Sequence, residues 1–63
     1  MFIEVQDTKG FISIINIDEI VKFYQIDRRQ VRINMTDGTY IVTTKNIDTL
    51  WEEIANVDGE QEK

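Results

Sequence analysis

The sequence predicts an α+β fold, in which a small antiparallel meander sheet of about five strands carries one C-terminal helix. Three observations predict it. Residues 31–44 form two alternating apolar and polar runs joined by Asp37-Gly38, the strongest short-range signal of a β-hairpin. Residues 2–26 contain further short runs rich in β-branched and aromatic residues, which favour strands. Residues 47–54 instead repeat their apolar side chains at helical spacing.

The first half of the chain predicts three strands. Residues 2–6 alternate with Ile3 and Val5 on one face, and residues 7–10 form a short turn that ends in glycine. Residues 11–16 therefore return antiparallel, and both faces of this second strand are apolar. Residues 16–19 predict a corner, because their short polar side chains can bond their own backbone. A third strand follows.

The third strand covers residues 20–26 and places Val21 and Phe23 on one face. Residues 27–30 then turn into the hairpin without glycine or proline. In the hairpin, Asp37-Gly38 predicts a type I′ turn, since these two residue types tolerate the positive φ that such a turn needs. We expect the core face of the hairpin to carry Val31, Ile33, Met35, Tyr40 and Val42.

The helix begins after Asn46, which can cap it, and carries Asp48 in its first turn, where a negative charge is favourable. Its apolar stripe recurs at i, i+3, i+4 and i+7 and consists of Ile47, Leu50, Trp51 and Ile54. We expect Trp51 to anchor the core. The helix should end near Asn56 or Val57, so that residues 1–57 form one domain and residues 58–63 a disordered acidic tail.

One helix cannot cover both faces of this sheet. Seven apolar side chains remain outside the predicted core, more than a contiguous wet surface usually holds. Either the sheet curls into a small barrel with a two-sided core, or these residues form an oligomer interface: Phe2, Phe11, Ile15, Ile17, Tyr24, Ile26 and Ile41.

The length favours help from a second subunit. A domain of 63 residues buries only roughly 60% of the surface that its unfolded chain exposes. The chain has no Cys and no His, which excludes disulfides and His or thiolate metal sites. A homo-oligomer, in the simplest case a homodimer, is therefore expected.

Charge is distributed unevenly over a chain whose net charge is −5. Residues 22–32 contain four basic side chains and one acidic side chain, whereas the last third of the chain is acidic. This basic stretch is the candidate partner-binding site, because guanidinium groups at a loop tip can bind phosphates or carboxylates. The alternative is that these charges only keep a strand edge from pairing. The candidate residues are Lys22, Tyr24, Arg28, Arg29 and Arg32.

No set of residues predicts catalysis, a cofactor or a metal. Adjacent carboxylates such as Asp18-Glu19 and Glu52-Glu53 diverge on a strand or a helix. Nucleophilic dyads of the common types need His or Cys, and neither is present. Because these residue sets are missing, we expect that the protein is not an enzyme. The longest apolar run is too short to span a membrane, so we expect a cytoplasmic protein.

Several short motifs follow one another along most of the chain: Ile15-Asn16, Ile20, Asp37-Gly38-Thr39-Tyr40-Ile41-Val42, Ile47 and Ile54. Their order resembles that of the small FlbD/SwrD-type flagellar and swarming-motility proteins. Those proteins read as strand, glycine turn, Leu-Asn, Ile, Asn-Gly-Lys, a Val-rich strand and a helix. Where they often carry a proline in the middle loop, this chain has Arg28-Arg29.

A second, partial resemblance is to the first part of the LytTR-type DNA-binding domain, and it is carried by residues 14–20, Tyr24, residues 40–42 and Leu50. The later basic segments and hairpin that read DNA in that domain are absent from this sequence. No DNA-contacting residues therefore follow from the resemblance.

Together these observations predict a non-enzymatic interaction or regulatory module, oligomeric and binding a protein partner. The alternative is a nucleic-acid-binding protein that uses Lys22, Arg28, Arg29 and Arg32.

Overall fold

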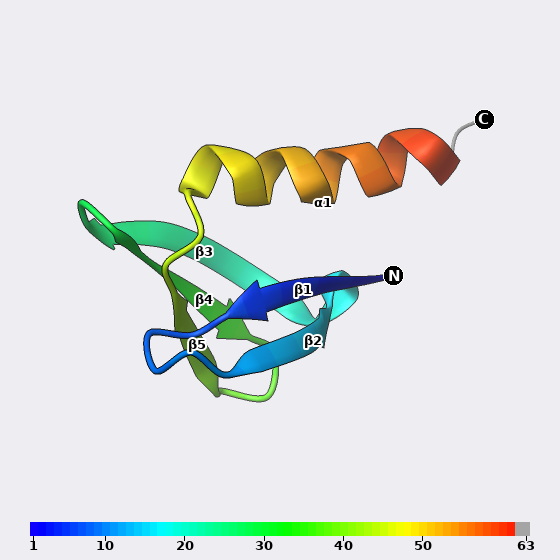
Figure 1. The fold of residues 1–63 in the computed structure, drawn as a ribbon. Helices are drawn as coiled ribbons and strands as arrows, with labels where there is room; N and C mark the ends of the chain where they lie inside the picture. Colours follow the sequence, from blue (N-terminus) through cyan, green and yellow to red (C-terminus); the bar gives the residue numbers. More distant parts are fainter. Residues whose placement is uncertain (62–63) are drawn as a thin grey trace.

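A computed structural model describes residues 1–61 and confirms the α+β fold (Figure 1). Five antiparallel strands precede one C-terminal helix, and a short 3-10 helix separates the second strand from the third. The elements are β1 (Phe2–Gln6), β2 (Ile12–Asn16), η1 (Ile17–Glu19), β3 (Ile20–Asp27), β4 (Gln30–Met35), β5 (Tyr40–Thr43) and α1 (Ile47–Gln61).

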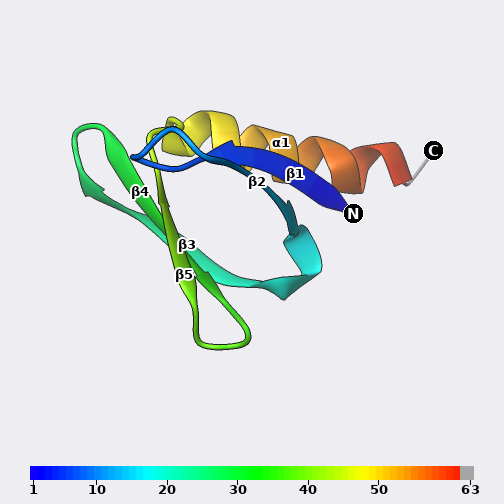
Figure 2. The same ribbon diagram turned by 60° about the horizontal axis from the view of Figure 1, so that its bottom comes forward.

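The strands form two sheets and not the single meander that the sequence predicted. One sheet contains β1 and β2, and the other has the order β3-β4-β5. The interruption lies at η1, where the Asn16 side chain accepts a hydrogen bond from the backbone N–H of Asp18 (3.0 Å). This cap holds the chain in a tight corner, so that β3 leaves in a new direction and does not pair with β2 (Figure 2).

The two sheets are linked at two corners only, and they do not close into a barrel. An isolated bridge joins Asp7 to Thr43 at one corner. At the other corner the chain itself passes from β2 to β3 through η1, where the bond from the backbone N–H of Thr36 to the carbonyl of Glu19 (2.8 Å) extends the β3-β4 ladder. The sheets therefore splay apart between these links, as Figure 2 shows for β2 and β5.

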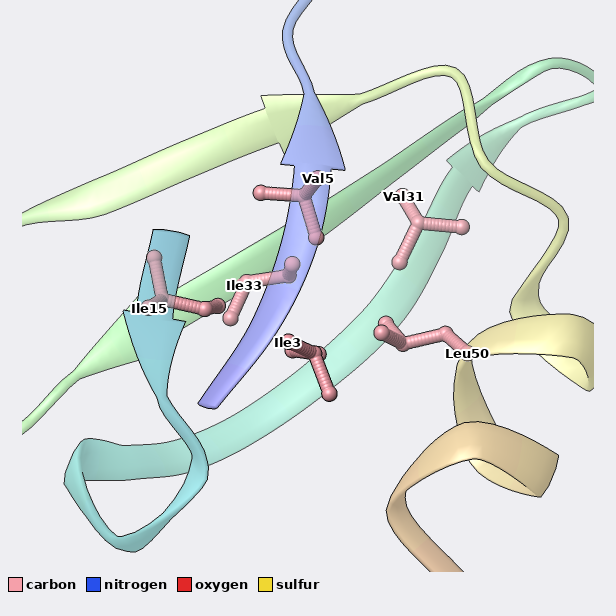
Figure 3. Packing of buried hydrophobic residues seen from close by; sticks show 6 residues of the cluster. All are labelled: Ile3, Val5, Ile15, Val31, Ile33 and Leu50. Carbon is pink, nitrogen blue, oxygen red and sulfur yellow. The ribbon is translucent and has the colours of Figure 1, made fainter. Parts of the chain in front are cut away.

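The core lies between the two sheets and the helix. Its buried side chains come from four elements, which face one another in Figure 3: Ile3 and Val5 of β1, Ile15 of β2, Val31 and Ile33 of β4, and Leu50 of α1. Thr43 is the buried polar residue of the described chain, and its hydroxyl donates to the carbonyl of Gln6 (2.6 Å). Burial of a polar group is tolerated here because it is bonded.

The helix begins as expected but ends later. The Asn46 side chain accepts from the backbone N–H of Asp48 (2.8 Å), which is a helix N-cap. Ile47, Leu50 and Ile54 face the core. Trp51 is 60% exposed and lies beside Phe23, with 6.4 Å between ring centroids, so the expectation that it anchors the core is wrong.

The predicted end near Val57 is wrong, since α1 continues to Gln61. The predicted acidic tail of residues 58–63 therefore begins inside the helix, and its last two residues lie outside the described residues.

The turn between β4 and β5 differs from the predicted type I′ turn. The N–H of Met35 donates to the carbonyl of Thr39 (2.9 Å), and the N–H of Gly38 donates to the carbonyl of Met35 (3.1 Å). Gly38 has φ +88°, whereas Asp37 has a negative φ. This is a three-residue loop, Thr36-Asp37-Gly38, with its glycine in the left-handed region.

The longer loop exchanges the two faces of β5. Ile33 pairs with Ile41 and Val31 with Thr43, so that Ile41 and Thr43 face the core. The prediction that Tyr40 and Val42 face the core is therefore wrong. A shift of one residue in register moves every side chain of a strand to the opposite face.

The same turn type joins β1 to β2. The N–H of Asp7 donates to the carbonyl of Phe11 (2.9 Å), and Gly10, with φ +92°, takes the left-handed position. Ser13 and Ile15 of β2 then face the core opposite Val5 and Ile3.

The apolar residues left over in the sequence divide between core and surface. Ile15 is buried, and Ile17 and Ile41 are partly buried against the core, so these three are shielded within one chain. Phe2, Phe11, Tyr24 and Ile26 remain exposed.

Val21, expected on the core face, is 62% exposed. The pairing of β3 with β4 shifts between Ile20 and Lys22, which leaves Val21 as the extra residue of a bulge.

We expect the stability lost on substitution of Gly38 to depend on how readily the new residue adopts a positive φ, and not on the size of its side chain. A Cβ at this position meets no atom within 4 Å, so only the positive φ is penalised. Gly38→Val should lower the free energy of unfolding by ~1–2 kcal/mol, and Gly38→Asn by less, because Asn visits the left-handed region more readily. Urea denaturation measures both. Equal losses for the two variants would contradict this origin.

Candidate functional site: the outer face of the three-stranded sheet

The side of the β3-β4-β5 sheet that faces away from the core carries the most distinctive set of polar and aromatic side chains. The register aligns two rows across the strands. Tyr24, Arg32 and Val42 form one row. Lys22, Asn34 and Tyr40 form the other. We call these six residues the outer sheet face.

Both tyrosines of this face lie beneath a cation. The Lys22 Nζ is 5.3 Å from the centroid of the Tyr24 ring, and the Arg32 Cζ is 3.8 Å from the centroid of the Tyr40 ring. The Arg32 Nε also donates to the Asn34 Oδ1 (2.9 Å). Exposed cation–π contacts are worth about 0.5–1 kcal/mol. They hold the charged groups against the sheet and restrict the Arg32 side chain to one orientation.

The outer sheet face has no carboxylate. Its two charged members, Lys22 and Arg32, are basic, although the chain as a whole has a net charge of −5. The local charge is therefore opposite in sign to that of the molecule. Such a surface attracts an anionic group over a short range, within about 8–10 Å at physiological ionic strength.

Three of the five predicted partner-binding residues meet on this face: Lys22, Tyr24 and Arg32. Sequence reasoning missed Tyr40, because the predicted type I′ turn placed it in the core. A three-residue loop that includes Thr36 is also compatible with the sequence. With that loop, Tyr40 would have been predicted on the same face as Arg32.

The other two predicted residues, Arg28 and Arg29, form the tip between β3 and β4. The Asp27 Oδ1 accepts from the backbone N–H of Arg29 (2.9 Å), and the Gln25 Nε2 donates to the Asp27 carbonyl (2.6 Å), which fixes the turn. Both arginines are exposed and line a pocket of about 420 Å³ with Lys45 and Asn46. They lie at the end of the sheet, and their pocket also includes Gln25, which alternates with Tyr24 and lies on the opposite side of β3.

Lys45 is occupied by structural contacts. Its Nζ lies 2.6 Å from the Glu53 Oε1 and donates to the carbonyl of Glu4 (2.7 Å). These bonds tie α1 to β1. The side chain therefore contributes to the attachment of the helix more than to recognition of a ligand.

The described residues contain no arrangement that supports metal chemistry. No group of three or more Cys, Asp or Glu side chains in residues 1–61 could hold a metal ion, and the chain has no His. No helix of the described chain is long and apolar enough to cross a bilayer.

Comparison with protein-family models, with curated proteins and with solved structures gives no match. The resemblances to the FlbD/SwrD-type proteins and to part of the LytTR-type domain therefore stay predictions from the sequence.

The pKa of the Asp37 carboxyl tests the structure of the turn that positions Tyr40. The hydroxyl of Thr39 donates to its Oδ1 (2.5 Å), as does the backbone N–H of Thr39 (2.9 Å), and these bonds lower the pKa of Asp37 below its ordinary value of 3.8. The ionised carboxylate therefore stabilises the fold above that ordinary pKa. This contribution is lost as the pH falls through the lowered pKa.

Thr39→Val removes the hydroxyl but keeps the backbone donor, so the Asp37 pKa should rise toward its ordinary value. Thr39→Ser keeps both donors and serves as the control. A carboxyl-detected NMR titration measures the pKa in all three proteins. An unchanged value in Thr39→Val would contradict the hydroxyl bond as the main cause.

Proposed function

We propose that this chain is a non-enzymatic interaction module that binds an acidic segment of a protein partner on the outer sheet face. The observation that carries the proposal is the pairing of Arg32 with Tyr40 beside Lys22 and Tyr24, on a surface free of carboxylates. Tyrosine and arginine are the residues that dominate binding energy in protein interfaces, together with tryptophan.

The geometry favours a carboxylate ligand. The Arg32 Cζ lies 3.8 Å from the centroid of the Tyr40 ring and its Nε is bonded to Asn34. Its terminal nitrogens can therefore bind a carboxylate in the two-pronged manner of guanidinium groups. The two rings add apolar area with little loss of side-chain entropy. Tyr40 is 54% exposed and Tyr24 is exposed as well, so both rings are accessible to a partner.

Substitutions on the outer sheet face should weaken binding without unfolding the protein. The partner is first captured with the tagged wild-type protein and then purified. Tyr40→Ala and Arg32→Glu should each raise the Kd for this partner by at least about tenfold, because each removes a central contact. Isothermal titration measures the affinities. The bound segment of the partner should be rich in Asp and Glu.

Trp51→Ala is the matched control, since Trp51 is a large aromatic residue of similar exposure on α1, away from the outer sheet face. It should leave the affinity within about twofold of wild type. The proposal fails if Tyr40→Ala and Arg32→Glu bind as the wild type does.

Single-stranded nucleic acid is the second candidate, favoured by the proximity of aromatic and basic side chains on a sheet. Two facts weigh against it. One face of each tyrosine ring is already covered by a cation, and the net charge of −5 repels a polyanion at long range.

A labelled oligothymidylate of about 15 nucleotides tests this candidate at low salt by fluorescence anisotropy. Binding that weakens steeply with added salt, and that Lys22→Glu or Arg32→Glu removes, would establish the nucleic-acid function. We expect no change in anisotropy up to about 100 μM protein, the weak end of non-specific binding.

A further inference from the structure

The free edge of β2 is unusually open for a natural sheet edge. β2 pairs only with β1, through a ladder in which Ser13 and Ile15 lie opposite Val5 and Ile3. Two backbone bonds show which residues of β2 direct their N–H and C=O groups toward β1. They run from the N–H of Asp7 to the carbonyl of Phe11 and from the N–H of Ile17 to the carbonyl of Met1. The backbone groups of Ile12, Ile14 and Asn16 therefore point away from β1.

Nothing in the sequence of β2 protects this edge. The strand reads ISIIN and contains no charge, proline or glycine, the devices that usually keep an edge strand from pairing. The free edge of β1 is covered instead, because Lys45 bonds the carbonyl of Glu4 and Thr43 that of Gln6. The edge of β3 carries Lys22 and ends at Arg28 and Arg29.

We propose that the β2 edge binds the β2 edge of a second copy of this chain, antiparallel and about a two-fold axis. Ile14 then lies opposite Ile14 of the second copy, and Ile12 opposite Asn16. The two β1-β2 sheets become one four-stranded sheet. β2 itself contributes no residue to the outer sheet face, although Tyr40 and Val42 of that face also line the pocket that carries Lys9.

Charge complementarity selects a second copy as the occupant. The groove between β2 and β5 contains two pockets that share Ile41. The pocket of about 290 Å³ carries two carboxylates, Glu19 and Asp37, and no basic residue. The pocket of about 370 Å³, at the opposite end of β2, carries Lys9 together with Asp7, whose Oδ1 accepts from the backbone N–H groups of Lys9 and Phe11. Lys9 has no ion pair among the described residues.

Antiparallel pairing brings the start of one β2 to the end of the other. Lys9 of each copy therefore comes to the end of the groove where the other copy carries Glu19 and Asp37, and the two-fold axis repeats this contact. Asp37 is held ionised by its bonds to Thr39, so its charge persists in mildly acidic solution.

The outer side of the β1-β2 sheet adds apolar area to the same interface. Ile12 and Ile14 of β2 are 60% and 62% exposed on this side, where Phe2 and Glu4 of β1 are their neighbours within the same chain. In the four-stranded sheet the two copies of Ile14 lie side by side at the axis. Cross-strand contacts of this kind stabilise sheet pairing.

Sedimentation equilibrium on the purified chain tests the proposal. The wild type should form a dimer, and Ile14→Lys should raise its dissociation constant at least about tenfold, because the axis places two lysines against each other. Val21→Lys introduces the same residue at a site that is also 62% exposed but lies on β3. This control should dimerise as the wild type does.

A charge exchange identifies the pairing direction. Lys9→Glu and Glu19→Lys should each weaken the dimer at least about tenfold, and the double variant should recover most of the loss. Arg29→Glu changes the net charge as Lys9→Glu does and should have little effect. Circular dichroism verifies that each variant is folded.

A wild type that stays monomeric to about millimolar concentration would overturn the proposal, as would a dimer that Ile14→Lys leaves intact. A double variant as weak as the single ones would overturn the antiparallel arrangement. None of these outcomes affects the binding of a partner to the outer sheet face, since the variants used there are different.

Discussion

The left-handed conformation of Gly10 and Gly38 determines which residues of this protein are buried. Each glycine closes a three-residue loop, and the length of that loop sets the register of its hairpin. Because side chains alternate along a strand, a loop shorter by one residue would exchange the two faces of β5 and place Tyr40 in the core. The outer sheet face exists because Gly38 permits the longer loop.

This constraint also explains what could be predicted from the sequence. Alternation and helical spacing are local, and they placed the five strands, the capping residue Asn46 and the stripe of α1 close to where they lie. The register of β5 depends on one residue of loop length, because Asp37-Gly38 fits a two-residue or a three-residue loop equally well by composition. Tyr40 was therefore assigned to the wrong face.

Local sequence patterns could not predict the division into two sheets, for a different reason. Asn16 was expected at a corner, but a corner is compatible with strands that continue to pair and with strands that diverge. The outcome depends on tertiary contacts such as the bridge between Asp7 and Thr43, which lie far apart in sequence. For the same reason Ile15 could not be assigned to the core from the sequence, whereas Lys22, Tyr24 and Arg32 lie together because they are on adjacent strands.

The divergence of the two sheets leaves the protein with two distinct surfaces. A closed barrel would pair the β2 edge and use its backbone groups internally. Here the two sheets meet at the Asp7–Thr43 bridge and at η1, and β2 and β5 stay apart between these points. Backbone donors and acceptors on the β2 edge cannot be removed by changing side chains, whereas the outer sheet face consists of side chains alone. The pairing that we propose with a second copy uses these backbone groups, which any strand can complement, so its specificity must come from the charges at the ends of the edge. The outer sheet face suits a different partner, because its recognition depends on the chemistry of Arg32, Tyr40 and their neighbours.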